Sequence, residues 1–101
     1  MNNRIQKVNS LLEQEISKII LRDFYFSGAL VTLTYVDSSA NLIEAKAYIS
    51  VFFTHQNLGE GGQDGKIDKI IETLNKGAYN IQQKINKLLK MRPIPKIKFV
   101  K

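Results

Sequence analysis

The chain has 101 residues, a formal net charge of +6 and no cysteine. This length predicts one domain, residues 1–101, with a single core. Without cysteine there are no disulfides, thiolate metal sites or cysteine nucleophiles. No apolar run approaches the roughly 18 residues of a membrane span, and the start of the chain has no signal-peptide core. We therefore expect a soluble, monomeric cytoplasmic protein that does not contact a membrane.

The first predicted element is a helix over residues 3–22. Glu13, Glu15 and Lys18 fall on its polar side. The apolar residues recur at helical spacing and predict one buried face: Ile5, Val8, Leu12, Ile16, Ile19 and Ile20.

Two β-rich segments follow, at 30–36 and 43–54, where apolar and polar residues alternate. The turn-forming residues between them predict an antiparallel hairpin. A last short strand is expected at 96–100. Between the hairpin and the next helix, the glycine-rich segment 55–66 is predicted to be a flexible loop.

The second helix is predicted over residues 66–91, with an apolar stripe that keeps its phase throughout. Gly77 lies inside this stripe and predicts a kink, and Arg92-Pro93 closes the helix because the residue before a proline disfavours the α region. Gly77 either adopts a backbone conformation that a Cβ disfavours, which is the alternative we favour, or lies in a regular helix that would tolerate a Cβ. The stripe consists of Ile67, Ile70, Ile71, Leu74, Ala78, Ile81, Ile85, Leu88 and Leu89.

The predicted order is helix, strand, strand, kinked helix, strand. This order indicates an α+β domain in which helices pack on one face of a three-stranded sheet. The other face of the sheet would then remain partly open to solvent.

The positive charge is concentrated near the C-terminal end. Residues 1–72 carry seven basic and nine acidic side chains, whereas residues 73–101 carry eight basic and no acidic ones. A segment of one sign attracts polyanions, so the sequence favours contact with RNA or DNA over a merely solvated surface.

No catalytic or metal-binding motif is present. The loop GEGGQDGK has neither the spacing nor the hydroxyl residue of a phosphate-binding loop, and Glu60 and Asp64 would repel phosphate. His55, the only histidine, has no cysteine or carboxylate partner at ligand spacing. We therefore expect no enzymatic activity, no cofactor, no metal and no small-molecule substrate.

Several segments together resemble the ribosome-binding factor A family. The similarity runs nearly from end to end, and it depends on the order and spacing of short matches rather than on any one motif. These matches are Arg4-Ile5-Gln6-Lys7-Val8, Glu15-Ile16-Ser17, Val31-Thr32-Leu33-Thr34, Leu42, the run from Ala45 to Val51, Leu74-Asn75, Ala78, Ile81, Pro95 and Phe99-Val100.

The resemblance implies a type II KH-like domain, α-β-β-α(kinked)-β, in which a helix kink at Ala-x-Gly replaces the usual GXXG loop. Only Ala78 matches the family's kink, since Tyr79 stands at the position of its glycine and Gly77 lies two positions earlier. The resemblance further implies a non-enzymatic factor that binds free small (30S) ribosomal subunits. Such a factor assists late maturation and processing of 16S rRNA near its 5′-terminal helix.

The candidate RNA-binding residues follow from the charge pattern. Lys84, Lys87, Lys90 and Arg92 form the main predicted patch, and Lys76, Arg4 and Lys7 are secondary candidates. The alternative is a protein interaction module whose exposed sheet face, with Tyr48 and Phe52, accepts a partner. Adsorption to anionic lipid is disfavoured because the core needs the helix's apolar face.

Overall fold

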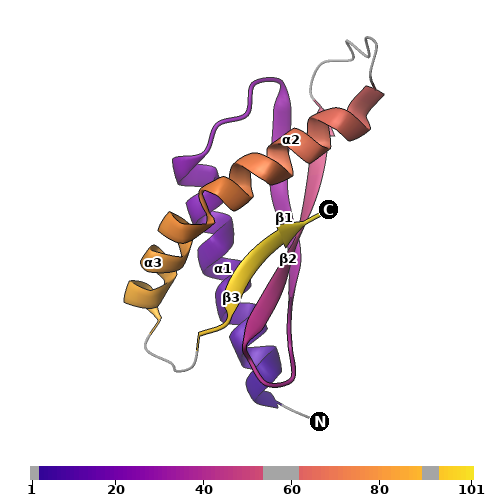
Figure 1. Ribbon diagram of the computed structural model, residues 1–101. Coiled ribbons are helices and arrows are strands. Elements are labelled where there is room, and N and C mark those ends of the chain that lie inside the picture. Colours follow the sequence, from indigo (N-terminus) through magenta and orange to yellow (C-terminus); the bar gives the residue numbers. More distant parts are fainter. Residues whose placement is uncertain (1–2, 54–61, 90–93) are drawn as a thin grey trace.

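The computed structural model describes residues 3–53, 62–89 and 94–101. Helix α1 (Asn3–Asp23) is followed by strands β1 (Ala29–Ser38) and β2 (Glu44–Phe53). Helices α2 (Gly62–Lys76) and α3 (Ala78–Leu88) precede strand β3 (Lys96–Val100). The predicted α+β order is thus confirmed, and the predicted kink lies at Gly77, where α2 and α3 meet at an angle (Figure 1).

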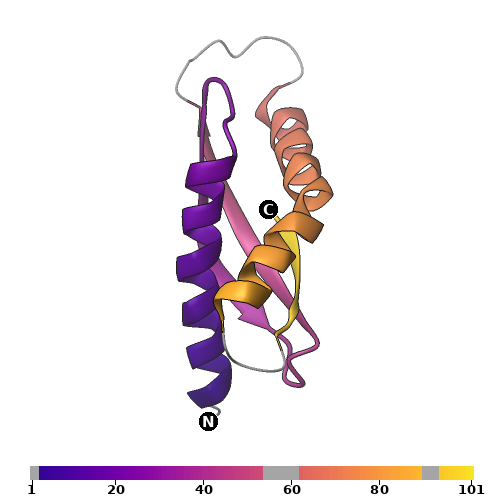
Figure 2. The same cartoon turned by 90° about the vertical axis from the view of Figure 1, so that its left-hand side faces the viewer.

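The three strands form one sheet in the order β1-β2-β3. β1 and β2 are antiparallel, and β2 and β3 are parallel. A parallel pair needs a crossover connection, which α2 and α3 provide. All the described helices lie on the same side of the sheet, and Figure 2 views the molecule from that side. Within the described part of the chain, no helix covers the opposite side.

The core lies between the sheet and the helices. The apolar stripe of α1 is buried as its periodicity predicts, with Leu12 and Ile16 fully inaccessible to solvent. From the sheet, Ala45, Ala47 and Phe99 face these helices and are 1% exposed or less. The small alanines leave room for the helix layer to approach the sheet closely.

Side chains of the helices cover the outer edges of the sheet. On β1, the backbone N–H of Val36 donates to Glu13 Oε2 and that of Ser38 donates to Asn9 Oδ1, both at 3.1 Å. On β3, the side-chain amides of Asn75 and Gln82 serve the same purpose. Because edge strands otherwise present unpaired backbone groups, these contacts protect the sheet against pairing with other chains.

The ends of the second helical region differ from the prediction. α2 begins at Gly62, so residues 62–66 are helical rather than part of the expected loop, whose remaining residues 55–61 lie outside the described ranges. Gly62 is the first residue of the helix, and Gly65 inside it costs only about 1 kcal/mol, which the rest of the helix outweighs. α3 ends at Leu88, three residues before the predicted end, because Leu89 turns to an extended conformation and buries its side chain.

Candidate nucleic-acid interface

The two helices of the basic segment each bury one side and expose the other. Leu74 of α2 and Ile81 and Ile85 of α3 are at most 2% exposed and fix the rotation of the helices about their axes. The side chains on the opposite side of these helices therefore point outward. We call the resulting surface the basic helix face, and it consists of Lys76, Tyr79, Asn80, Gln83, Lys84 and Lys87.

Two lysines of this face are already paired. Lys76 Nζ lies 3.3 Å from Glu72 Oε1, one turn earlier in α2. Lys84 Nζ donates a hydrogen bond to Asp23 Oδ2 at the end of α1. The same carboxyl group accepts a bond from the Nε of its neighbour Arg22 at 3.0 Å. Asp23 thus joins the end of α1 to α3.

Asp23 stays ionised at neutral pH. Its hydrogen bonds with Lys84 and then Arg22 lower the pKa of its carboxyl group below the usual 3.8. A lowered pKa in the folded protein means that the contact stabilises the fold above about pH 3.8, and that this contribution is lost as the pH falls through the lowered pKa. Near pH 7 the charge of Lys84 is therefore compensated in the free protein.

Arg22 belongs to this surface, although its place in the sequence gives no sign of it. Its side chain is 62% exposed, and its guanidinium shares the Asp23 carboxylate with Lys84. The two cations lie far apart in the chain, and only the packing of α1 against α3 brings them together (Figure 2). Arg22 therefore adds a planar guanidinium, which suits bidentate contact with phosphate.

Lys87 is the most available cation of α3. It lies in the last turn of the helix, where the helix dipole favours positive charge. Within the described ranges no ion pair involves it. A phosphate group would therefore have no protein carboxylate to displace there.

The secondary candidates at the start of the chain lie away from this surface. Arg4 and Lys7 are exposed near the start of α1, and Lys7 is roughly 24 Å along the helix axis from Asp23 at 1.5 Å per residue. Lys90 and Arg92, two members of the main predicted patch, lie outside the described residues.

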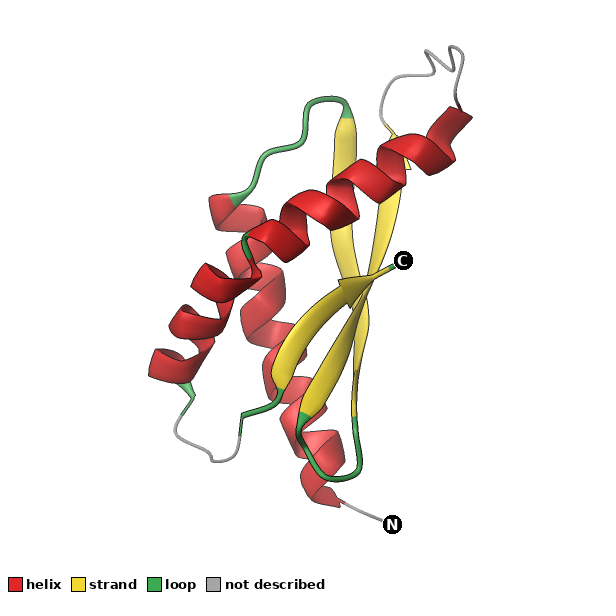
Figure 3. Cartoon of the chain, in the orientation of Figure 1, coloured by secondary structure: helices red, strands yellow, loops and turns green. Residues whose placement is uncertain are grey.

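The kink lies where α1 ends. Figure 3 shows the break between α2 and α3, and Gly77 occupies it with φ −88° and ψ 3°. Hydrogen bonds still cross the break, from Gly77 N to Thr73 O and from Ile81 N to Gly77 O, both at 3.1 Å. Any residue can adopt this backbone conformation, so the expectation that the backbone itself excludes a Cβ is wrong.

Phe24 supplies the physical reason for a glycine at this position. A Cβ on Gly77 would lie 3.0 Å from Cζ and 3.4 Å from Cε2 of the Phe24 ring. The ring in turn stacks on Phe26, with the centroids 6.1 Å apart. Gly77 thus allows the aromatic segment after α1 to pack against the bend. Tyr79, in the first turn of α3, is 73% exposed and adds an aromatic ring to the basic helix face.

We expect Gly77→Ala to lower the free energy of unfolding by about 1 kcal/mol. The cost of displacing the Phe24 ring should exceed the stabilisation that comes from the lower entropy of the unfolded chain. Urea denaturation measures this change. Gly65→Ala is the matched control, since a Cβ there meets no atom within 4 Å and should stabilise α2 by about 0.5–1 kcal/mol.

A second background isolates the cause. In Phe24→Ala protein the space beside Gly77 is open, so adding Gly77→Ala should no longer destabilise. If Gly77→Ala destabilised both backgrounds equally, the Phe24 contact would not be the reason for the glycine.

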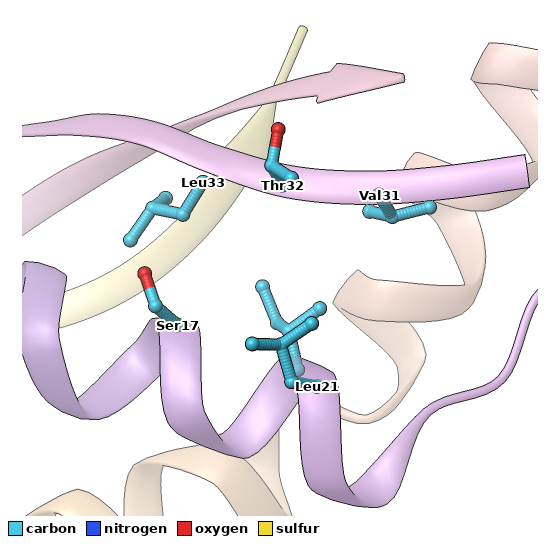
Figure 4. A pocket seen from close by; sticks show the side chains of 6 residues that line it. Ser17, Leu21, Val31, Thr32 and Leu33 are labelled. Carbon is cyan, nitrogen blue, oxygen red and sulfur yellow. The ribbon is translucent and has the colours of Figure 1, made fainter. Parts of the chain in front are cut away.

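One further pocket borders the first helix and the first strand. It has a volume of about 220 Å³ and is lined by Ser17 and Leu21 on the helix and by Val31 and Leu33 on the strand (Figure 4). Its lining holds no titratable side chain. Within the described ranges no three His, Cys, Asp or Glu residues gather as a metal site would require. None of the helices there has an apolar stretch long enough to cross a membrane.

Comparison with known proteins gives the same family as the sequence pattern. The family model for ribosome-binding factor A matches residues 4–101. Ribosome-binding factor A of Akkermansia muciniphila is 32% identical over 101 residues, which cover 98% of this chain and 71% of that protein.

Solved structures share the fold. The crystal structure of ribosome-binding factor A from Thermus thermophilus matches with a TM-score of 0.70 at 15% identity, over 95% of this chain and 93% of the other. A homology model of the T. thermophilus factor, fitted into a cryo-EM map of a 30S complex with that factor, gives a TM-score of 0.68 at 14% identity, over 90% and 87%. The KH-like arrangement of the helices and the sheet is thereby confirmed.

Proposed function

Because the chain belongs to the ribosome-binding factor A family, we propose that it binds free small (30S) ribosomal subunits as an assembly factor in the cytoplasm. The basic helix face is the proposed contact surface, and 16S rRNA is the proposed partner. The observation that carries this assignment is a run of 29 residues, 73–101, without one acidic side chain, part of which the fold presents on exposed helix surface.

The proposed binding is mainly electrostatic. Lys76, Lys84, Lys87 and Arg22 would each meet a backbone phosphate, and Tyr79 would pack on a ribose or a base. Lys84 and Arg22 would exchange the Asp23 carboxylate for phosphate. Such contacts position the protein on structured RNA without reading its sequence.

We propose that the factor assists late maturation and processing of 16S rRNA near its 5′-terminal helix. In this role it binds and does no chemistry on the RNA. A protein that prefers one conformation of the RNA raises the population of that conformation, and the processing enzymes then act on it. The size of the effect is limited by the difference in affinity between the two RNA conformations.

Sedimentation with ribosomal particles tests the proposal. We expect the protein to pellet with purified free small subunits and not with joined 70S ribosomes, and to be released from the subunits as the salt concentration rises. Equal binding to both particles would contradict an assembly role. Binding that is insensitive to salt would contradict the electrostatic contact.

The Asp23 carboxylate gives a further prediction, in which a substitution increases the affinity for the small subunit. Asp23→Asn should strengthen binding to the small subunit, because Lys84 and Arg22 would no longer have to leave a carboxylate before meeting phosphate. Glu15→Gln is the matched control, since it removes the same charge from α1 where Glu15 pairs with Lys18, at 3.6 Å. Filter binding at constant salt should show tighter binding for the first variant alone.

A further inference from the structure

The side of the sheet opposite the helices carries three aromatic rings, of which Tyr35 and Phe52 are exposed and Tyr48 is half-buried. Tyr35 of β1 and Tyr48 of β2 are paired in register and stack with their ring centroids 4.3 Å apart and 12° between the planes. Phe52, further along β2, is 68% exposed and lies beside Leu30, which is 50% exposed. Large apolar groups left in water in this way often mark a binding surface.

Lysines lie in the row next to the tyrosines. Lys46 precedes Tyr48 by two residues on the same face of β2. Lys98 of β3 is the partner of Lys46 in register. Like charges directly across two strands repel, and within the described ranges neither lysine forms an ion pair. An anion placed between them would relieve this repulsion.

The acidic side chains of this face lie to one side of that pair. Asp37 is across from Lys46 on β1, and Glu44 is across from Lys96 on β3. The carboxylates beside Lys46 and Lys98 therefore lie towards β1 and towards the β1–β2 turn. A phosphate is best accommodated on the β3 side of this row.

The spacing between the two rows suits a nucleotide. Two residues along a strand span roughly 6.6 Å, comparable to the reach from a base to its own phosphate. The outer side of the Tyr35–Tyr48 stack offers a flat surface for one base, and Phe52 offers another further along β2. Aromatic rings stack on any base, which makes such a platform tolerant of sequence.

We propose that the open sheet face, formed chiefly by Tyr35, Tyr48, Phe52, Lys46 and Lys98, binds unpaired nucleotides of RNA. The rings would stack on the bases while the two lysines contact the phosphates. This surface is separate from the basic helix face and lies on the other side of the sheet. If the proposed function holds, the protein would be bound between a structured RNA element on the helices and a single-stranded segment on the sheet.

Fluorescence polarisation with a labelled single-stranded oligouridylate tests this inference on the full chain. We expect the double variant Tyr35→Leu/Tyr48→Leu to bind the oligonucleotide about tenfold more weakly. We expect Lys46→Gln/Lys98→Gln to lower the slope of log affinity against log salt by about 1.4, as the loss of two phosphate contacts to a single strand predicts. Circular dichroism confirms that each variant is folded.

A helix-face variant separates this inference from the proposed function. Lys76→Glu/Lys87→Glu should weaken binding to small subunits. In this background the sheet substitutions should still weaken oligouridylate binding by the same factor as in the wild type. If wild-type protein does not bind oligouridylate at low salt, or if both folded sheet variants bind it as wild type does, the inference is overturned. The sheet face would then fit a protein partner better, while subunit binding through the helices would stand or fall independently.

Discussion

Reversing two charges on the basic helix face should weaken binding to the small subunit by at least about tenfold. We expect this of Lys76→Glu/Lys87→Glu, because each substitution removes a phosphate contact and adds a repulsive charge. The slope of log affinity against log salt should also fall by about 2. Lys84 is better changed to Gln, since a Glu at that position would face Asp23 and disturb the fold.

The matched control is Arg4→Glu/Lys7→Glu. It changes the net charge of the protein by the same amount at the far end of α1. If the local surface determines binding, the control should retain most of the affinity and most of the salt slope. Equal losses in both double variants would indicate that overall charge, and not the basic helix face, attracts the RNA.

The largest expected effect on stability concerns Gln82. Its Oε1 accepts a hydrogen bond from Ile97 N at 2.9 Å, and its Nε2 donates to Pro95 O at 3.1 Å. Gln82→Ala should lower the free energy of unfolding by about 2–3 kcal/mol, because two partly buried backbone groups would lose their partners. Urea denaturation measures the change, and the adjacent exposed Gln83→Ala should alter it by no more than about 0.5 kcal/mol.

Gln82→Glu distinguishes the hydrogen bonds from general packing. It keeps the shape and the acceptor for Ile97 N but places a carboxylate oxygen against Pro95 O in place of the donor, so it should destabilise the protein although the packing is unchanged. A Gln82→Ala protein as stable as the Gln83→Ala control would show that water replaces the amide fully.

The same contact connects stability with function. Asn75 of α2 exchanges two hydrogen bonds with the backbone of Phe99, at 2.9 and 3.0 Å. Gln82 of α3 binds the preceding part of β3. The two amides lie on opposite sides of Gly77, so together they hold both helices to one strand and fix the angle of the bend. The relative placement of Lys76 and Lys87 therefore depends on an edge of the sheet.

The periodic elements were predictable because local patterns determine them. The stripe of α1, the alternation of β1 and β2 and the short strand β3 each bury one face, and their expected limits agree with the structure to within two residues. A one-residue bulge between Leu33 and Tyr35 was not visible in the alternation. Because of this extra residue, Val36 points into the core and Tyr35 points outward, the reverse of what strict alternation from Val31 would give.

The features that shape the candidate site depend on residues far apart in the chain. The kink at Gly77 was expected, but the Phe24 ring that a Cβ at this position would meet was not, and neither was the pairing of Lys84 with Asp23. No local pattern reports such contacts. The sequence showed where positive charge was concentrated, but the packing of α1 against α3 determines which cations are paired and adds Arg22 to the surface.

Photo-crosslinking tests the central claim, that the basic helix face contacts ribosomal RNA, most directly. A photoreactive amino acid would replace Gln83, in the middle of that face, or Gln14, on the exposed side of α1, as a control. On irradiation with free small subunits, we predict a crosslink to 16S rRNA from position 83 and none from position 14. A crosslink from position 14 but not from position 83, or one from position 83 to ribosomal proteins alone, would contradict the account.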